Sequence, residues 1–368
     1  MFSLNDKISL RQFQILLMLD IFGTGVIILP RKAAIFAGRD GWVAFMLTIA
    51  LALVAVFIIT RLVNRFPNKT LYEYAGTLVS KPIAFVLVLG LVTRIIIGMA
   101  CELRYFTEIV RHVLLYNTPF TVVAVSLLLV SAYAAGKGIE TRARIGQIII
   151  WIIFIPLVLV FIVVGANVDF SELKPVLYYT ENSELFGGAF HMLFAFSGIE
   201  FILLISPYLN RHKHVTRRAM ASILTIGVFM CVMIIMAIGR FGPYNLQSQM
   251  WPVLEMMDMA PIPGSFIERQ EAVMMSFWIL SVFAMISAGM FFSAVASKSI
   301  FKVGKHKYYL LIIAAVTFVL SFVLEDTRLI DQVKELNFIY LGTVYMLILP
   351  TILLILAKVR RINHEKSS

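Results

Sequence analysis

Charged residues are scarce in this chain. Only 14% of its 368 residues are Asp, Glu, Lys or Arg, whereas 60% are apolar, and the mean hydropathy is +0.90. A soluble globular domain carries about 25% charged residues. The composition therefore excludes an ordinary soluble domain and predicts an all-α polytopic membrane protein.

Cysteine is nearly absent as well, because Cys101 and Cys231 are the only two. Both fall inside apolar stretches, which excludes a disulfide framework and a CxxC metal site. No two histidines have the i, i+4 spacing of a buried haem or metal ligand pair. P-loop, nucleophile-elbow and zincin motifs do not occur. Nothing in the sequence predicts an enzyme, a metal or a cofactor.

What the chain has in abundance is long apolar runs. A helix needs about 20 apolar residues to cross the hydrocarbon core. On that criterion ten spans are expected, near residues 12–30, 41–60, 83–112, 120–136, 144–165, 186–206, 217–239, 272–297, 308–324 and 337–357.

The net charge of +11 is distributed as the positive-inside rule requires and does not indicate nucleic-acid binding. With both termini cytoplasmic, the expected inner segments hold most of the Lys and Arg, namely Lys7, Arg11, Arg61, Arg65, Lys69, Lys81, Lys137, Arg142, Arg144, Arg211, Lys213, Arg217, Arg218, Lys298, Lys302, Lys305, Lys307, Lys358, Arg360, Arg361 and Lys366. The expected outer segments hold most of the acidic residues, namely Asp169, Glu172, Glu181, Glu184, Glu255, Asp258, Glu268, Glu271, Glu325, Asp326, Asp331 and Glu335. An even number of spans fits this asymmetry.

Ten spans divide into two blocks of five, residues 1–165 and 186–368, within a single permease-like domain. Because five is odd, the second block enters the membrane from the opposite side, so it is expected to be an inverted repeat of the first. The first span of each block is interrupted, by Gly23-Thr24-Gly25 in one and by Ser197-Gly198 before Glu200 in the other. Paired broken helices are typical of transporters with a binding site near the middle of the membrane.

A broken helix leaves backbone N–H and C=O groups that protein, water or a ligand must satisfy. Half-helix N-termini can bind a carboxylate, and unwound carbonyls can bind an ammonium group or a cation. The alternative is that these glycines only let two helices pack closely.

Ionisable residues within the spans are the next signal, because a charge in lipid turns toward a cavity or a partner. Asp20 shares a helical face with Gly23 beside the first break. Arg94 and Glu200 are equally compatible with ligand binding and with an ion pair. Glu102, Arg104 and Glu108 are spaced like a structural ion network, and Asp20 is assigned to such a network as well. His191 is read as a packing residue, with a proton relay as the alternative.

Several segments in order along the chain resemble the permease-like B subunit of bacterial endospore germinant receptors, a branch of the amino acid–polyamine–organocation (APC) superfamily. They are Gly23-Thr24-Gly25 with Leu29-Pro30-Arg31, then Glu102, Arg104 and Glu108 before Thr118-Pro119, then Lys174-Pro175-Val176-Leu177, then Gly198 and Glu200 before Pro207, Trp251-Pro252, residues 266–269 with Glu271, and the basic tail at Lys358, Arg360 and Arg361.

The resemblance implies a ten-helix LeuT/APC-type inverted-repeat fold in the inner membrane of a spore. It implies a subunit that recognises a small germinant, commonly an amino acid, and works with an A subunit and a lipoprotein C subunit. The ligand pocket of that family lies between spans one, three, six and eight. By position this includes Gly23, Thr24, Gly25, Arg94, Ser197, Gly198, Glu200, Ser281, Ala284 and Ser287.

Two departures from the wider superfamily qualify this expectation. Residues 144–165 contain no lysine, whereas some proton-coupled relatives place one in span five, so proton coupling is not expected. Arg94 is unusual for a pocket wall and indicates an acidic or otherwise distinctive ligand. Two alternatives share the architecture: a secondary transporter that accumulates amino acids, and a water or ion conduit within a larger complex.

Overall fold

The computed structural model describes residues 6–23, 25–165, 168–258, 270–304, 306–324 and 326–360. Nearly all of this is helical, and the isolated bridge between Ile8 and Leu209 is the β-pairing found in these ranges. Some residues singled out above lie outside the described residues: Thr24, the 266–269 segment, Lys305, Glu325, Arg361 and Lys366.

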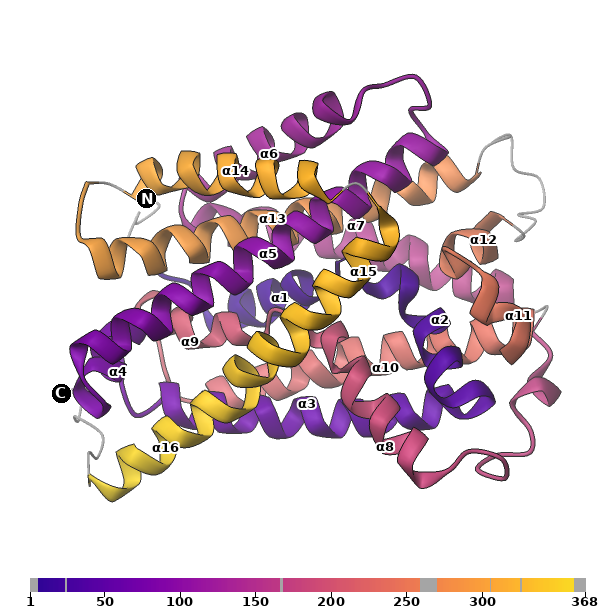
Figure 1. Cartoon of the computed structure of the whole chain (residues 1–368), viewed down its shortest axis with the longest axis horizontal. Helices are drawn as coiled ribbons and strands as arrows, with labels where there is room; N and C mark the ends of the chain where they lie inside the picture. The colour runs from indigo at the N-terminus through magenta and orange to yellow at the C-terminus, as the bar shows by residue number, and fades with distance from the viewer. Residues whose placement is uncertain are drawn as a thin grey trace.

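The chain forms sixteen α-helices and several shorter 3₁₀ or π segments within the described ranges (Figure 1). The first half contains α1 (Leu10–Ile21), α2 (Gly25–Ala37), η1 (Gly38–Asp40), α3 (Gly41–Val63), α4 (Leu71–Leu78), α5 (Lys81–Val113), α6 (Phe120–Gly136) and α7 (Ile139–Gly165). The second half contains η2 (Phe170–Leu173), α8 (Asn182–His191), η3 (Met192–Phe196), η4 (Ile199–Phe201), α9 (Ile202–Ile205), η5 (Ser206–Tyr208), α10 (Val215–Phe241), α11 (Pro243–Ser248), α12 (Pro252–Asp258), α13 (Gln270–Phe301), α14 (His306–Val323), α15 (Thr327–Leu336), η6 (Asn337–Gly342), η7 (Val344–Ile348) and α16 (Leu349–Val359).

Six helical stretches of the described chain are long and apolar enough to cross a membrane, and a bent pair, residues 182–196 with 199–208, makes a seventh. One stretch, Gly25–Val63, runs through α2 and α3 together, and α6 and α14 are shorter apolar helices. The expectation of an all-α polytopic membrane protein is confirmed. The count of ten spans stays a prediction.

Both described ends of the chain lie at one end of the helix bundle. Lys7 Nζ donates a hydrogen bond to Asn68 Oδ1 at 3.5 Å, and Arg360 Nη1 donates one to the Thr77 carbonyl at 3.2 Å. Asn68 and Thr77 belong to the same connection between α3 and α5. The position of these two described ends fits the even number of spans that the charge distribution predicts, and the number itself stays a prediction.

Local sequence fixes where several helices begin. Ser9 accepts a hydrogen bond from the Gln12 N–H at 3.3 Å, and the Gln12 side chain accepts one from the Ser9 N–H at 2.9 Å. Thr70 and Glu73 form the same reciprocal pair at the start of α4. Each capping box satisfies two N–H groups that a helix start would leave unpaired.

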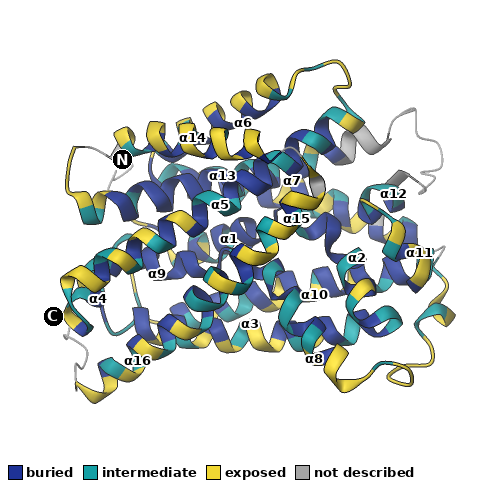
Figure 2. Cartoon of the chain, in the orientation of Figure 1, coloured by how far each residue is buried: buried dark blue, intermediate teal, exposed yellow. Residues whose placement is uncertain are grey.

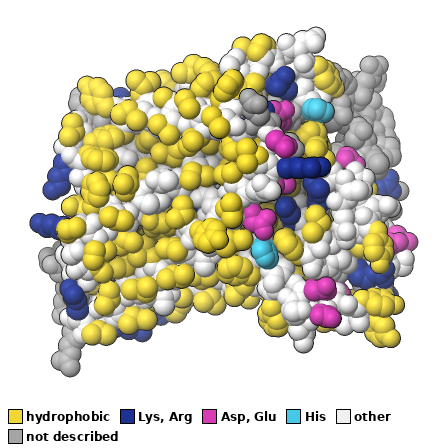
Figure 3. Space-filling view, in the orientation of Figure 1, with side chains coloured by type: hydrophobic (Ala, Val, Ile, Leu, Met, Phe, Trp, Pro, Cys, Tyr) yellow, Lys and Arg dark blue, Asp and Glu magenta, His cyan; other side chains and the backbone are white. Residues whose placement is uncertain are grey.

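Apolar side chains fill the interior and also cover the sides of the bundle. Figure 2 shows the interior helices buried and outward faces of α6, α14 and α16 exposed. In Figure 3 hydrophobic side chains cover most of this surface, and charged ones gather near the ends of the molecule and in a cluster toward its right side. Such an apolar exterior fits contact with lipid.

The expected breaks are present in both interrupted helices. Phe22 leaves the helical conformation after α1, and α2 starts again at Gly25. In the other span Ser197 is extended, Gly198 has a left-handed φ of 113°, and the two halves are bent by 54°.

Candidate functional site

The two breaks lie against each other. A Cβ at Gly198 would lie 2.9 Å from the backbone oxygen of Asp20, and a Cβ at Gly23 would lie 2.2 Å from the sulfur of Met285 on α13. A larger residue at either position would collide with its neighbour. These glycines therefore allow the unwound backbone of the first span to contact both the second break and α13.

Glu200 contacts both the backbone of the second break and a side chain of a neighbouring helix. Its Oε2 accepts a hydrogen bond from the Gly198 N–H at 3.0 Å. Its Oε1 lies 2.9 Å from Nη2 of Arg94 on α5, and both side chains are 4% exposed. The second contact is an ion pair without an aligned hydrogen bond, since neither Nη2 nor Nε of Arg94 has a hydrogen-bond partner within the described residues.

Arg94 is also tied to the last membrane-crossing stretch. Its backbone oxygen accepts a hydrogen bond from Asn337 Nδ2 at 3.2 Å, at the start of the π-helical η6. A Cβ at Gly342 would lie 3.3 Å from the Arg94 guanidinium. Arg94 thus touches a break and a π-helix at once, and π segments are frequent at functional sites.

A second buried ion pair holds the first break. Arg142 Nη2 of α7 lies 2.9 Å from Asp20 Oδ1, with the side chains 3% and 4% exposed. The same nitrogen is 3.4 Å from the backbone oxygen of Ala284 on α13. The guanidinium therefore joins α1, α7 and α13, and it is a fixed positive charge beside the unwound backbone.

A third group of polar contacts joins α15 to α5. Lys334 Nζ donates to Glu102 Oε1 at 2.6 Å, and the Tyr105 hydroxyl donates to Asp331. Arg104 pairs with Glu108 at 2.8 Å along α5 itself. Of the residues expected in an ion network, Glu102 therefore pairs with a lysine of another helix, and Arg104 pairs with Glu108 within α5.

A cavity of about 50 Å³ lies between these pairs. That exceeds the space needed for one water, roughly 10–15 Å³, several times over. It is lined by Asp20, Arg94, Ile95, Gly98, Met99, Glu102, Phe194, Ser197, Gly198, Glu200, Phe201, Met285, Gly289, Lys334, Asn337 and Phe338. Among these, Asn337 Oδ1 is a buried acceptor with no hydrogen-bond partner in the described part of the chain.

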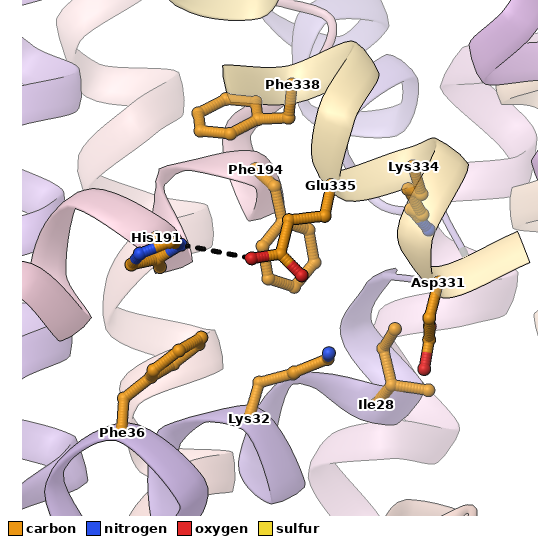
Figure 4. A pocket seen from close by; sticks show the side chains of 9 residues that line it. All are labelled: Ile28, Lys32, Phe36, His191, Phe194, Asp331, Lys334, Glu335 and Phe338. Carbon is orange, nitrogen blue, oxygen red and sulfur yellow. Dashed lines mark ion pairs between the residues drawn. The ribbon is translucent and has the colours of Figure 1, made fainter. Parts of the chain in front are cut away.

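A second pocket, of about 30 Å³, adjoins the first and shares Phe194, Lys334 and Phe338 with it (Figure 4). Its remaining lining comes from α2, α8 and α15: Ile28, Lys32, Phe36, His191, Asp331 and Glu335. His191 Nδ1 lies 3.5 Å from Glu335 Oε1, the contact dashed in Figure 4. Phe194 and Phe338 line both pockets. We call the pocket beside His191 and Glu335 the outer pocket.

Comparisons of this sequence with family models and with curated proteins indicate the same family. A family model described as "Spore germination protein" matches residues 7–330. The chain belongs to the spore germination permease family. That family is permease-like and is not a family of enzymes.

Curated relatives of this family align over most of the chain. Spore germination protein YndE of Bacillus subtilis is 27% identical over 82% of this chain and 83% of its own length. Spore germination protein KB of the same organism is 24% identical over 98% of this chain and 97% of its own. The resemblance stated from the sequence is confirmed.

Among solved structures, that of MhsT in complex with L-phenylalanine superposes with a TM-score of 0.68 at 14% identity, covering 94% of this chain and 88% of the other. At this identity the likeness speaks for the fold alone. The expected LeuT-type architecture with two broken helices is confirmed.

The structure collects only part of the site expected for this spore germination permease. Arg94, Ser197, Gly198 and Glu200 line the cavity, together with Asp20, which was assigned to the ion network. Of the remaining expected residues, Thr24 lies outside the described residues, and Gly23, Gly25, Ser281, Ala284 and Ser287 do not line the cavity. Gly23 packs on Met285, Gly25 faces Phe194, the Ser281 hydroxyl donates to the Trp278 carbonyl at 2.7 Å, and Ala284 offers its oxygen to Arg142. Ser287 is buried, and its hydroxyl has no partner among the described residues.

Sequence reasoning missed Arg142, Lys334 and Asn337. Arg142 was counted with the inner segment because the fifth span was expected from 144, whereas α7 begins at Ile139 and buries it. A buried Asp20 demands a nearby cation, and that requirement could have pointed to Arg142. Lys334 and Asn337 come from α15 and η6, where no expected feature marked them.

Proposed function

We propose that this chain is the ligand-binding, permease-like subunit of a spore germinant receptor and that its ligand is an amino acid. The observation that carries the proposal is the buried Arg94–Glu200 pair beside the second break. The two charges of this pair are complementary to the two charges of a zwitterion. MhsT, which has the same fold, was solved in complex with L-phenylalanine, so amino acids are the first ligands to test.

The ligand carboxylate would bind Arg94, whose Nε and Nη2 make no hydrogen bond to the described residues. Charge-assisted hydrogen bonds to a carboxylate are the strong ones. The ligand ammonium would bind Glu200, with Asn337 Oδ1 as a further acceptor. In this arrangement the amino acid inserts into the ion pair, so each buried charge keeps an opposite partner throughout.

The receptor signal would follow from differential affinity. Arg94 holds α5, the second break and η6 together. A ligand that binds better when this contact is open shifts the population toward the open arrangement, by no more than that difference in affinity. The ligand would enter the cavity through the outer pocket, past Phe194 and Phe338.

We further propose that the receptor includes an A subunit and a lipoprotein C subunit and lies in the spore inner membrane with both termini cytoplasmic. Residues 1–165 and 186–368 would be the two inverted repeats. Three groups of observations support this: the family, the apolar spans and the meeting of the chain ends at one end of the bundle.

The test is a germination assay on spores that carry Arg94→Gln, Glu200→Gln or both, across a panel of amino acids, sugars and nucleosides. Loss of a hydrogen bond to a charged group costs about 1.5–3 kcal/mol, so each single variant should raise the half-maximal ligand concentration about 10- to 150-fold. Arg144→Gln, in the more exposed pair with Glu140, is the matched control and should respond normally.

The double variant separates binding from folding. With both charges removed no buried charge is left unpaired, so membrane abundance should return toward the native level while the response stays lost. A native response of Arg94→Gln at native abundance would disprove this site. Saturable uptake of labelled amino acid by the purified chain would favour the secondary transporter instead.

A further inference from the structure

A groove runs between α6 and α14 on the lipid-facing side of the bundle, and among the described residues it shares no lining residue with the candidate ligand cavity. The two helices pack side by side at one edge of the molecule (Figure 1). The groove measures about 560 Å³, within the range of roughly 300–1,000 Å³ typical of binding pockets. It is lined by Val125, Leu128, Leu129, Ala132, Tyr133, Gly136, Lys137, Lys307, Leu310, Leu311, Ala314, Ala315 and Phe318.

The sequence creates this hollow by placing small residues between large ones. Gly136 has no side chain, and a Cβ there would already lie 3.5 Å from the Leu310 side chain. Leu310 is 5% exposed and belongs to the floor, whereas Tyr133 and Leu311 are 68% and 77% exposed and form the rim. The groove is therefore an apolar channel open toward the surrounding membrane.

The groove carries positive charge at one end only. Lys137 directly follows α6, and Lys307 lies in the first turn of α14, so both mark the same end of two antiparallel helices. Both are exposed, and Lys137 Nζ lies 4.9 Å from the centre of the Tyr133 ring. A Cβ at Gly138 would touch Asp6, so the end of the groove that carries the lysines lies near the start of the described chain.

We propose that this groove binds an anionic phospholipid, with one acyl chain in the apolar channel and the phosphate between Lys137 and Lys307. Lipid tails are as apolar as leucine, so burial alone does not favour a lipid in a membrane-facing groove. Selectivity must come from the head group, and two lysines complement an anionic one. Each basic residue near an anionic surface contributes about 1 kcal/mol, or about fivefold in affinity.

The proposal can be tested by native mass spectrometry on the purified full chain, titrated with phosphatidylglycerol or with phosphatidylcholine of the same acyl composition. We expect one phosphatidylglycerol per chain, preferred about 25-fold. Lys137→Gln and Lys307→Gln should each reduce the preference about fivefold, and the double variant should abolish it. Lys358→Gln, at the end of α16, is the matched control and should leave it unchanged.

Gly136→Leu tests the channel separately, since it should weaken binding of both lipids by filling the groove. An unchanged preference in the lysine double variant would overturn the proposal, as would non-saturable binding of either lipid.

A protein partner is the competing occupant. Leu311→Cys, labelled with benzophenone maleimide in native membranes, should cross-link to lipid, and both native cysteines are buried. Cross-linking to another protein chain would assign the groove to that partner and overturn the lipid proposal.

Discussion

Two pairs of buried charges in this protein join elements far apart in the sequence. Arg94 meets Glu200 across 106 positions, and Asp20 meets Arg142 across 122, each at 2.9 Å. A buried charge without a partner is costly, whereas a well-formed pair can be close to neutral in stability. The pairs therefore fix which helices face one another more than they add to the free energy of unfolding.

Asp20 and Arg142 provide the stability test of this idea. Asp20→Asn or Arg142→Gln alone leaves one buried charge unpaired and should destabilise the protein by about 3–5 kcal/mol. The double variant should recover most of that loss, because no unpaired charge remains. Size-exclusion chromatography after heating in detergent would measure the three variants. A double variant that is as unstable as the sum of the two single variants would show that the pair is not coupled.

At the residue scale the sequence marked Arg94, Glu200 and Asp20 as charges within apolar spans, and the structure buries all three. The sequence could not supply their partners. Pairing across more than a hundred positions depends on how helices pack, which no local pattern records. Arg142 shows the difficulty most clearly. It lies two residues before the expected fifth span, so the positive-inside rule explains it as a residue of an inner segment. In the structure Arg142 lies within α7 and is buried.

At the element scale both broken spans were predictable, because glycines interrupt both apolar runs. In the second span the structure requires glycine at the break, since another residue there would be strained. Gly198 has a φ of 113°, and its position against the Asp20 backbone leaves no room for a Cβ. The last span was predicted as one helix over 337–357, whereas it contains two π segments, η6 and η7. Nothing in its apolar pattern distinguishes a π-helix from an α-helix.

Gly198→Ala is the element-scale prediction. The left-handed backbone and the 2.9 Å approach to Asp20 should together destabilise the protein by about 1–3 kcal/mol and weaken the germination response. Gly187→Ala is the matched control within the same broken span, since a Cβ there meets nothing within 4 Å. It should be neutral or stabilise α8 by about 0.5–1 kcal/mol. Equal behaviour of the two variants in thermal stability would contradict the strain argument.

At the scale of the whole molecule, the fold is more predictable than the cavity. Apolar runs and charge asymmetry require only local sequence, and they predicted a polytopic helical membrane protein. The family resemblance implied the LeuT-type fold that the comparison with MhsT supports. The cavity depends on Lys334, Asn337 and Phe338, which arrive from the last span and were not marked. The cavity residues that lie at helix breaks were therefore predictable. Those that reach the cavity only through helix packing were not.

The even number of crossings expected from the charge distribution yields a topological prediction. Lys7→Cys and Lys358→Cys, near the two chain ends, should react with a membrane-impermeant maleimide only after permeabilisation if both ends are cytoplasmic. Tyr179→Cys should react in intact cells, because it follows α7 at the opposite end and its side chain is 70% exposed. Labelling of positions 7 and 358 from opposite sides would require an odd number of spans. It would contradict both the inverted-repeat arrangement and the contacts that bring Lys7 and Arg360 to the same connection.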